Sequence, residues 1–491
     1  MTTTSAKTDY RLLIGGEWVA GTDGAYGVVN PATEEIVAEA PEAGVADVDA
    51  AAGAARAALP AWKRTSPEER ANLLSQLGDA IRARQSELLP LIIAETGATL
   101  AVGSALQVPQ AVARFERYAR GALEDISVPL PPSVMPTTPL AAGGLIGGHV
   151  LRQPVGVVAC ISPYNFPLVS MAGKIGPALA TGNTVVMKPA PQDPLAIVEL
   201  ARVCEEVGFP PGVVNVVTGT SPELGRALVE SDDVDMVSFT GSTAVGVRIY
   251  ESGGATMKRL LLELGGKGAC VVLDDADVNQ AIAALVSVWA FHSGQICTAP
   301  TRAIVHRTLC DQLVDGLMSA APHLKVGAPT EADTVVGPVI SAAHRERIEG
   351  YVDTGVDEGG ELVLDGRRPA GLDRGYYVGP TLLTGCTNGM TAVREEIFGP
   401  VLVVVPFDDE DEAIAIANDS DYGLYDYVFS TDSARAYRVA RQLEAGHVGI
   451  NTAQRNHEAQ FGGFKMSGIG RDGGDFGLYA YTEVQSIIWP G

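Results

Sequence analysis

Between residues 150 and 250 the sequence alternates short apolar runs with longer amphipathic stretches, and this alternation constrains the fold more than any other feature. Short apolar runs predict buried strands, and the stretches between them have the length and period of helices. Strands that alternate with helices form a parallel sheet covered by helices, so we expect an α/β fold whose ligands bind at the carboxyl ends of the strands. The expected strands are 155–161, 184–188, 213–217 and 236–239, and the expected helices are 170–180, 195–207, 223–230 and 243–250.

A second alternating stretch begins with an expected strand at 269–273 and continues to Gly468. A chain of 491 residues exceeds the size that one hydrophobic core usually serves, so we expect two or three domains. Ser66 as N-cap and Pro67 at the first helical position favour a helix that starts there. The N-terminal part has expected strands at 11–14 and 17–19 and expected helices at 46–59, 67–83 and 108–124.

The segment 129–148 interrupts this pattern with five prolines, several glycines and no helical period. It is either a flexible surface loop or an extended hairpin that projects from the body and pairs with another subunit. We favour the hairpin. The tail, 479–489, is again typical of a strand.

The charge balance is strongly acidic, with 35 basic and 59 acidic residues and a formal net charge of −24. This balance disfavours nucleic acid and anionic membranes as partners. The six cysteines contain no C-x-x-C pair, which argues against a disulfide framework or a zinc site and fits a reducing cytoplasm. The seven dispersed histidines give no metal-binding pattern. Residues 1–10 are polar, so no signal peptide is expected, and no apolar run predicts a membrane span.

Cys297 is the candidate nucleophile, because it follows an expected helix at 278–291, ended by Gly294, and precedes an expected strand at 303–306. Reactive groups are often held on short loops between rigid elements. Glu263 ends an apolar run, and a buried carboxylate with a raised pKa can act as a general base. Each has a simpler interpretation: a free cysteine is usually a small buried hydrophobe, and a strand-end glutamate can reach solvent. Together they suggest covalent catalysis followed by attack of water.

Polar groups also stand at the carboxyl ends of two other expected strands. Lys188 ends one, and Gly241 and Ser242 follow another and lead into a helix. Free backbone N–H groups at a helix N-terminus bind phosphate, so these residues favour a dinucleotide site, although a lone strand-end lysine is usually only solvated. Asn165, directly after a strand, is a candidate oxyanion donor or a turn residue between two prolines.

The motifs, in this order, resemble those of the NAD(P)-dependent aldehyde dehydrogenase superfamily over nearly the full length. They are Ser162-Pro163-Tyr164-Asn165-Phe166-Pro167, Met187-Lys188-Pro189-Ala190, Phe239-Thr240-Gly241-Ser242 with Gly246, Glu263-Leu264-Gly265-Gly266-Lys267, Gly294-Gln295-Ile296-Cys297, Glu395-Glu396-Ile397-Phe398-Gly399-Pro400 and Phe461-Gly462-Gly463-Phe464-Lys465-Met466-Ser467-Gly468.

The resemblance implies a role for each motif. Cys297 would attack an aldehyde, Asn165 would hold the oxyanion, and Glu263 would activate water to release the acid from a thioester. The cofactor would be NAD, with NADP also tolerated. Its expected contacts are Ile161, Ser162, Pro163, Lys188, Gly241, Ser242, Gly246, Leu264, Glu396 and Phe398.

The resemblance also implies a three-part fold: a Rossmann-like cofactor domain (1–127 and 150–265), an α/β catalytic domain (266–468) and a small β oligomerisation arm (128–149 and 479–491). The expected partners are a small aldehyde and further copies of the chain, as a homodimer or homotetramer. Neither a metal, nucleic acid nor a membrane is expected.

Departures from the family pattern refine these expectations. Pro191 stands where many NAD-preferring relatives carry a glutamate that repels a 2′-phosphate, so we expect NADP to be tolerated. Gly173 is small where many relatives are bulky, which predicts a roomy pocket for aromatic or branched aldehydes. The polar segment 453–458 would line the substrate mouth. The rival functions are a coenzyme A-acylating dehydrogenase, disfavoured by Glu263, and a thiol esterase or other hydrolase. A non-catalytic scaffold is also disfavoured, because the catalytic set is intact.

Overall fold

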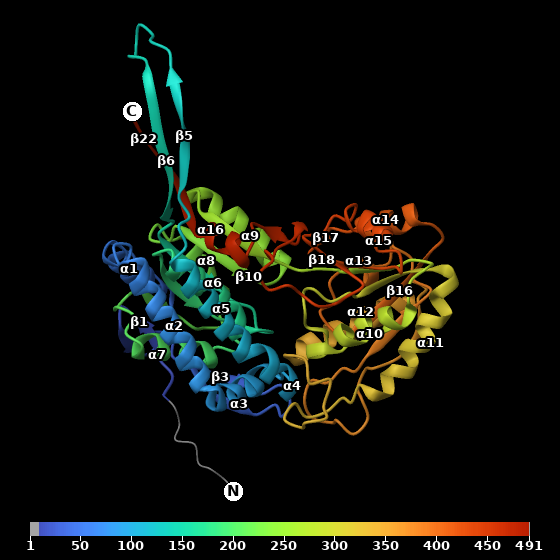
Figure 1. Ribbon diagram of the computed structural model, residues 1–491. Coiled ribbons are helices and arrows are strands. Elements are labelled where there is room, and N and C mark those ends of the chain that lie inside the picture. Colours follow the sequence, from blue (N-terminus) through green and yellow to red (C-terminus); the bar gives the residue numbers. More distant parts are fainter. Residues whose placement is uncertain (1–8, 491) are drawn as a thin grey trace.

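The computed structural model describes residues 9–490, so the polar stretch before Asp9 and the final glycine lie outside the described residues. Two α/β bodies lie side by side, and a narrow β arm projects from one of them (Figure 1). The first body contains the N-terminal helices and the sheet predicted between residues 150 and 250. The second contains most of the chain after residue 268. The α/β fold expected from the alternation of strands and helices is therefore correct.

The first body is built on an eight-stranded sheet with the order β2-β1-β9-β8-β7-β10-β11-β21. Its five central strands are parallel, and the outer strands β1, β2 and β21 pair antiparallel to their neighbours. The pairing of β21 with β11 was not predicted. The strands are β1 (Leu12–Ile14), β2 (Glu17–Val19), β7 (Val157–Ile161), β8 (Thr184–Lys188), β9 (Val214–Val216), β10 (Met236–Thr240), β11 (Arg259–Glu263) and β21 (Gly468–Ile469).

Helices pack on both faces of this sheet. One face packs against α2, α5, α6 and α7, with Phe115 and Leu179 in its core, and the other packs against α1, α8 and α9. The helices are α1 (Val45–Trp62), α2 (Pro67–Ala83), α3 (Gln85–Thr96), α4 (Leu100–Val102), a π-helical turn (Gly103–Gln107), α5 (Val108–Ala122), α6 (Pro167–Ala180), α7 (Leu195–Glu206), α8 (Pro222–Glu230) and α9 (Thr243–Gly253), followed by a 3₁₀ turn (Gly254–Thr256). A separate hairpin joins β3 (Ala25–Val29) to β4 (Ile36–Pro41).

Local sequence signals explain where two of these helices begin. The Ser66 hydroxyl accepts a hydrogen bond from the Glu69 backbone N–H, and Pro67 occupies the first helical position, as predicted. Helix α6 begins at Pro167, three residues before the predicted start, because proline fits the first helical turn without losing a hydrogen bond. This earlier start brings the helix close to Asn165.

The second body has a seven-stranded sheet with the order β14-β15-β16-β13-β12-β18-β19, parallel except for β14 at one edge. Its strands are β12 (Ala269–Val272), β13 (Arg302–His306), β14 (Glu361–Leu364), β15 (Thr381–Thr384), β16 (Val401–Phe407), β18 (Tyr425–Phe429) and β19 (His447–Ile450). Its helices are α10 (Val278–Trp289), α11 (Cys310–Ala320), α12 (Ala342–Asp357), α13 (Thr391–Arg394), α14 (Glu410–Asn418) and α15 (Ser433–Ala440), with 3₁₀ turns at Phe291–Gly294, Arg307–Leu309 and Ala321–His323. The short strands β17 (Tyr422–Gly423) and β20 (Phe464–Lys465) pair with each other.

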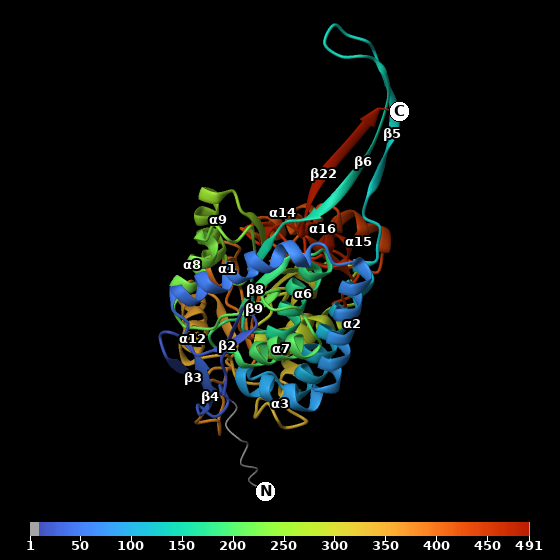
Figure 2. The same cartoon turned by 90° about the vertical axis from the view of Figure 1, so that its left-hand side faces the viewer.

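The arm is a three-stranded antiparallel sheet with the order β22-β6-β5. Strands β5 (Val128–Met135) and β6 (Gly144–Pro154) form the projecting hairpin that we favoured from the sequence, and β22 (Thr482–Pro490) lies along β6 (Figures 1 and 2). The tail was expected to be a strand from Tyr479. Instead Tyr479 lies in the last turn of α16 (Gly474–Ala480), and the strand starts at Thr482. Apolar side chains such as Val134 and Ile488 are exposed on the arm. Within residues 9–490, every helix is too short or too polar to cross a membrane.

Candidate active site

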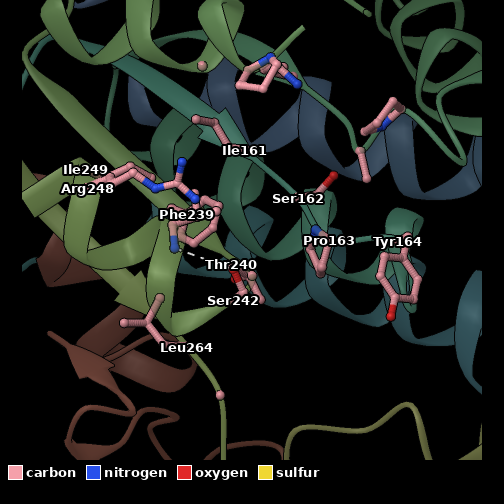
Figure 3. A pocket seen from close by; sticks show the side chains of 18 of the residues that line it. Ile161, Ser162, Pro163, Tyr164, Phe239, Thr240, Ser242, Arg248, Ile249 and Leu264 are labelled. Atoms are coloured by element: carbon pink, nitrogen blue, oxygen red, sulfur yellow. Dashed lines mark hydrogen bonds between the residues drawn. The ribbon is translucent and has the colours of Figure 1, made fainter. Parts of the chain in front are cut away.

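A pocket of about 810 Å³ opens at the carboxyl ends of β7, β8 and β10, where ligands bind in parallel α/β sheets. Figure 3 shows the turn from Ile161 to Tyr164 on one side of it and Arg248, Ile249 and Leu264 on the other. The structure therefore brings together most of the residues singled out from the sequence. Those that line the pocket are Ile161, Ser162, Pro163, Asn165, Lys188, Gly241, Ser242, Leu264, Cys297, Glu396 and Phe398.

One end of the pocket is the N-terminus of helix α9. Ser242 caps this helix, with its hydroxyl accepting a hydrogen bond from the Val245 backbone N–H at 3.4 Å. Gly246 is not part of the pocket lining. A Cβ at Gly246 would overlap the Leu264 side chain, so this glycine lets α9 pack closely on the strand-end loop. The helix end offers backbone N–H groups and a favourable dipole for a phosphate group.

Lys188 is a buried amine beside this helix end. Its Nζ lies 3.5 Å from the Pro189 carbonyl oxygen, at the limit of a hydrogen bond. Burial lowers the pKa of Lys188 to about 8, and Glu42 opposes the change. A buried ammonium with one weak partner fits a site that receives polar or anionic ligand groups.

Two arginines at this end of the pocket were not singled out from the sequence. Arg226 and Arg248 line it, together with Pro191. Arg226 forms an ion pair with Glu223, whereas the Arg248 Nε donates to the Ala244 carbonyl. Both arginines are on helix surfaces, where a sequence pattern alone predicts only solvated charge.

The opposite end of the pocket holds Glu396 and Phe398. The Glu396 Oε1 accepts a hydrogen bond from the Gly266 backbone N–H at 2.9 Å, and burial raises the pKa of this carboxyl to about 7. Phe398 adopts a left-handed backbone conformation (φ 59°), and its ring meets that of Tyr164 edge to face. A hydrogen bond between His344 and the Phe398 carbonyl holds this arrangement, and both residues line the pocket together with Tyr164.

The loop that carries Cys297 differs from the predicted simple end of a helix. Helix α10 stops at Trp289, and His292, Ser293 and Gly294 then all adopt left-handed conformations. A Cβ at Gly294 would overlap the backbone carbonyl of Gly399, so only glycine fits here. Three side chains from this loop reach neighbouring backbone groups: His292 contacts the Asn165 carbonyl, Ser293 donates to the Gly337 carbonyl, and Gln295 accepts from the Ile340 N–H.

Cys297 is half-buried and lines the pocket. Burial raises the pKa of its thiol to about 12, and the carboxyls of Glu396 and Glu263 add to the increase. Arg455 and the cysteine's own backbone N–H act in the opposite direction. In this state the sulfur is a protonated thiol at neutral pH, and a nearby positive charge would be needed to form the nucleophilic thiolate.

Asn165 lies against the cysteine loop and is 5% exposed. Its Nδ2 donates to the Gln295 carbonyl at 2.7 Å, and its Oδ1 accepts from the Phe166 backbone N–H at 3.1 Å. An amide nitrogen carries two hydrogens, so one N–H remains for an oxygen that develops negative charge. The side chain is held in place before any substrate arrives.

Glu263 ends strand β11 and is 3% exposed. Within the described part of the chain, neither carboxylate oxygen has a hydrogen-bond partner. Burial raises the pKa of this carboxyl well above its usual range, and Asp472 adds to the increase, whereas Lys174, Arg471 and Arg455 oppose it. A Cβ at Gly462 would lie 2.9 Å from the Glu263 Oε1, so this glycine leaves space beside the carboxylate. A buried, unpartnered carboxylate is a strong base once it is ionised.

The expected open space beside Gly173 is absent. A Cβ at Gly173 would overlap the Arg114 guanidinium, which also lies 3.6 Å from the Asp472 carboxylate. The glycine therefore makes room for an arginine of helix α5 and not for a bulky substrate. Because Gly173 and Arg114 are far apart in the sequence, no local sequence pattern could predict their contact.

The chain is similar to known proteins over nearly its full length. The model of the aldehyde dehydrogenase family matches residues 18–487. The chain is 40% identical over 484 residues to a 3-succinoylsemialdehyde-pyridine dehydrogenase of Pseudomonas sp., covering 98% of both proteins. It is also 40% identical over 482 residues to a 2-hydroxymuconic semialdehyde dehydrogenase of Pseudomonas sp. strain CF600, covering 96% of this chain and 98% of that protein.

Among solved structures, the chain is similar to betaine aldehyde dehydrogenase from Staphylococcus aureus in complex with NAD⁺. The TM-score is 0.93 at 36% sequence identity, and the superposition covers 97% of this chain and 94% of the other.

Proposed function

The chain belongs to the aldehyde dehydrogenase family, and we propose that it oxidises an aldehyde to a carboxylic acid through a covalent adduct on Cys297. The observation that carries this proposal is the position of the Cys297 thiol and the Asn165 amide at one pocket of dinucleotide size. Glu263 lies on the neighbouring strand end as a buried carboxylate without a partner. The proposed nucleophile Cys297, oxyanion donor Asn165 and base Glu263 thus come from three different segments of the chain.

In the first step the Cys297 thiolate would attack the carbonyl carbon of the aldehyde. A carbon–sulfur bond forms, and the carbonyl π electrons move to the oxygen. The Asn165 Nδ2 and the Cys297 backbone N–H would donate hydrogen bonds to this oxyanion, and such donors act most strongly where charge develops. When the oxyanion collapses to a carbonyl, the carbon loses its hydrogen as hydride and a thioester remains on the sulfur.

In the second step Glu263 would remove a proton from a water molecule that attacks the thioester. The carbon–sulfur bond breaks, the acid leaves, and the thiolate is restored. The raised pKa of Glu263 makes its ionised form a stronger base than an exposed carboxylate. The space beside Gly462 gives this side chain freedom to approach the reacting carbon.

The residues of the pocket fit a nicotinamide dinucleotide, which supplies the hydride acceptor when bound. Gly241 and Ser242 at the α9 N-terminus would hold the pyrophosphate, and Lys188 would contact the adenosine ribose. Glu396 and Phe398 would position the nicotinamide ribose and ring. Ile161, Ser162, Pro163 and Leu264 line the walls. Gly246 would contribute through the packing of α9.

Both NAD and NADP are accepted in this proposal. Pro191 presents no carboxylate at the adenosine end, and Arg226 and Arg248 line the same part of the pocket. A 2′-phosphate would therefore meet positive charge without an opposing carboxylate from residue 191. The name of the solved betaine aldehyde dehydrogenase complex supports NAD as one cofactor.

The substrate is an aldehyde that fits between Cys297 and Glu263. Two relatives are named for semialdehydes, one of which carries a pyridine ring, and this supports aldehydes that are larger than simple linear ones. The rings of Tyr427, Tyr425, His447 and Phe461 form a stack near the cysteine loop, in which both tyrosines are buried and Phe461 is half-buried. In this proposal an aromatic or bulky aldehyde would contact the accessible end of this stack, since Arg114 fills the space beside Gly173.

The arm is proposed to join further copies of the chain into a dimer or tetramer, because its exposed apolar residues are typical of a surface that is covered by a partner. The division of the chain into cofactor domain, catalytic domain and arm also stays a prediction. The six free cysteines are compatible with a reducing cytoplasm.

The deciding experiment follows the absorbance of the reduced nicotinamide with a panel of aldehydes and both cofactors. We expect acid to form without coenzyme A, and Cys297→Ala to abolish the reaction. Formation of an acyl-coenzyme A only when coenzyme A is added would favour the acylating alternative. Ester cleavage without any cofactor reduction would favour a thiol esterase.

A further inference from the structure

The backbone carbonyl of Asn165 accepts hydrogen bonds from two side chains that take no part in the proposed reaction steps. The His292 Nε2 lies 2.7 Å from this oxygen, and the Gln107 Nε2 lies 3.1 Å from it. A carbonyl oxygen has two lone pairs and can only accept, so both side chains must present an N–H to it. Both are buried, so bulk water does not compete for the oxygen.

Gln107 is the last residue of the π-helical turn between α4 and α5. Pro109, the second residue of α5, has no N–H to donate to the carbonyl four residues earlier, and in a regular α-helix its ring would clash with that carbonyl. A widened turn removes this conflict, and such turns are frequent at functional sites. Here the widened turn ends on the residue that contacts Asn165.

His292 contacts the same oxygen from the loop of the candidate nucleophile. Since its Nε2 donates, the Nδ1 of the neutral ring carries no proton, and within the described residues this Nδ1 has no hydrogen-bond partner. Burial lowers the pKa of His292 to about 4, so the ring is neutral at neutral pH. The ring also packs on that of Phe166, with the two centres 5.1 Å apart. The carbonyl is therefore held without a positive charge on this histidine.

The held carbonyl belongs to the peptide group between Asn165 and Phe166, and the other end of this group binds the Asn165 side chain. The Phe166 N–H donates to the Asn165 Oδ1 at 3.1 Å. Because a peptide group is planar, its C=O and N–H move together. A rotation that turns the carbonyl away from His292 and Gln107 would also turn the N–H and release the Oδ1. The two donors therefore help to set the orientation of the Asn165 amide.

Three hydrogen bonds close this arrangement into a ring. His292 donates to the Asn165 carbonyl, the Asn165 Nδ2 donates to the Gln295 carbonyl at 2.7 Å, and the Gln295 Nε2 donates to the His292 carbonyl at 3.3 Å. All three side chains are buried. Since each residue both donates and accepts, displacement of one changes the positions of the other two. The orientation of the Asn165 amide thus depends on the whole ring.

We propose that His292 and Gln107 are positioning residues for oxyanion stabilisation, which orient the Asn165 amide through the Asn165–Phe166 peptide group. Neither side chain contacts the substrate. The inference rests on the proposed function, because it concerns the oxyanion donor of the same reaction. Loss of either N–H should leave the thiol in place and misalign the amide, and a misaligned donor stabilises the transition state less.

The test removes the N–H donors and keeps the size of the side chains. His292→Met has no donor, whereas His292→Gln has nearly the same shape as methionine and retains an N–H, so these two variants are a matched pair. Gln107→Met is an independent variant outside the cysteine loop, and it carries the test if His292→Met does not fold. Gln76→Met, on the exposed surface of helix α2, makes the same change far from the site and should behave as the wild type.

Two rates are measured for each variant. The single-turnover rate of cofactor reduction at saturating aldehyde depends on the oxyanion, whereas alkylation of Cys297 by iodoacetamide forms no oxyanion. His292→Met and Gln107→Met should lower the first rate roughly 10- to 100-fold, as expected for a displaced catalytic group. KM and the alkylation rate should change less than about threefold. His292→Gln should restore most of the lost rate.

A double-mutant cycle with Asn165→Ala tests whether the two residues act through the amide. In that background each methionine variant should lower the single-turnover rate less than about twofold, because the group that it orients is absent. Undiminished effects in the Asn165→Ala background would overturn the inference. Full activity in both methionine variants would also overturn it, and so would parallel losses in cofactor reduction and alkylation, which indicate a distorted cysteine loop.

Failure of the proposed function gives a different result. An Asn165→Ala enzyme that reduces the cofactor as fast as the wild type would contradict the oxyanion role of Asn165 itself. A wild-type enzyme that oxidises no aldehyde would contradict the proposed reaction as a whole.

Discussion

The Nδ2 of Asn165 donates a hydrogen bond of 2.7 Å to the backbone carbonyl of Gln295, two residues before the thiol of Cys297. The candidate oxyanion donor and the loop of the candidate nucleophile are thus fixed to each other. One side chain supports the shape of the loop and has a second N–H, which we propose donates to the substrate oxygen.

Replacement of Asn165 should therefore affect chemistry more than substrate binding. We expect Asn165→Ala to lower kcat roughly 10²- to 10³-fold, the usual effect of removing one oxyanion donor. Steady-state kinetics with a preferred aldehyde and thermal unfolding of the same variant measure the two roles separately. A variant that keeps its kcat would show that Asn165 has only a structural role.

Glu263→Gln should separate the two halves of the reaction. Hydride loss needs the thiolate but not the base, so rapid mixing should still give one equivalent of reduced cofactor per active site. The following steady-state rate should fall roughly 10²- to 10⁴-fold, because thioester hydrolysis loses its general base. Glu230→Gln at the exposed end of helix α8 is a matched control. Loss of the initial burst would mean that Glu263 acts earlier than proposed.

The same carboxyl predicts a pH dependence. Burial raises the pKa of Glu263 well above its usual range, so at low pH the side chain is protonated and cannot accept a proton from water. The hydrolysis rate should rise as pH increases through this raised pKa, and Glu263→Gln should remove that rise. Rates of acid release measured over a pH series for both enzymes test this. A wild-type rate of acid release that does not change between pH 5 and about 9 would contradict this prediction.

The Cys297 thiol should react slowly before ligands bind. With a pKa of about 12, the thiolate fraction and the alkylation rate should increase about tenfold per pH unit around neutrality. Arg455→Gln should slow alkylation at a given pH, because Arg455 lowers the pKa of this thiol, whereas Arg438→Gln, at an exposed position of helix α15, should have no effect. Iodoacetamide labelling is followed by mass spectrometry of the peptide, which distinguishes Cys297 from the half-buried Cys310. Equal rates in the two variants would exclude an electrostatic role for Arg455.

Pro191→Glu should make the enzyme selective for NAD. A carboxylate at this position would repel a 2′-phosphate, so kcat/KM with NADP should fall roughly 100-fold, since like charges placed together cost several kcal/mol. The value with NAD should change much less. Initial rates with both cofactors check this. A wild-type enzyme that already prefers NAD by several orders of magnitude would show that Arg226 and Arg248 do not bind the phosphate.

Gly294→Ala tests the strained loop that carries the thiol. The left-handed backbone alone should lower the free energy of unfolding by about 1–3 kcal/mol, and the overlap with Gly399 adds to this. Gly350→Ala, in helix α12 with open space around it, should raise the free energy of unfolding by about 0.5–1 kcal/mol. Denaturant unfolding of both variants gives the two values. An unchanged free energy of unfolding in Gly294→Ala would mean that the loop can adopt another conformation.

The strand ends were predictable because each depends on neighbours in the sequence. The runs that end at Lys188 and Glu263 are apolar and short, and the glycine after Thr240 marks the start of a turn, so their places on one sheet edge follow from the parallel arrangement. The Ser66 cap was predictable for the same reason.

Contacts between distant segments were not predictable. Strand β21 has two residues and no period that could indicate a strand, yet Gly468 pairs with Glu263. The sequence predicted open space beside Gly173, but Arg114, which lies 59 positions earlier in the chain, fills that space. The loop before Cys297 has three consecutive left-handed residues, and hydrogen bonds from Ser293 to Gly337 and from Ile340 to Gln295 stabilise it. A local sequence pattern cannot indicate partners that lie so far along the chain.

The pairing of Gly468 with Glu263 has a consequence for the order of events during synthesis. Residues 462–490 supply the glycine beside Glu263, the strand that pairs with it, Asp472 and the final strand of the arm. A ribosome-bound chain that has already made Cys297 and the whole cofactor pocket still lacks these parts. In the proposed mechanism, a chain released before residue 462 would carry the Cys297 thiol without the surroundings that Glu263 needs to hydrolyse the thioester.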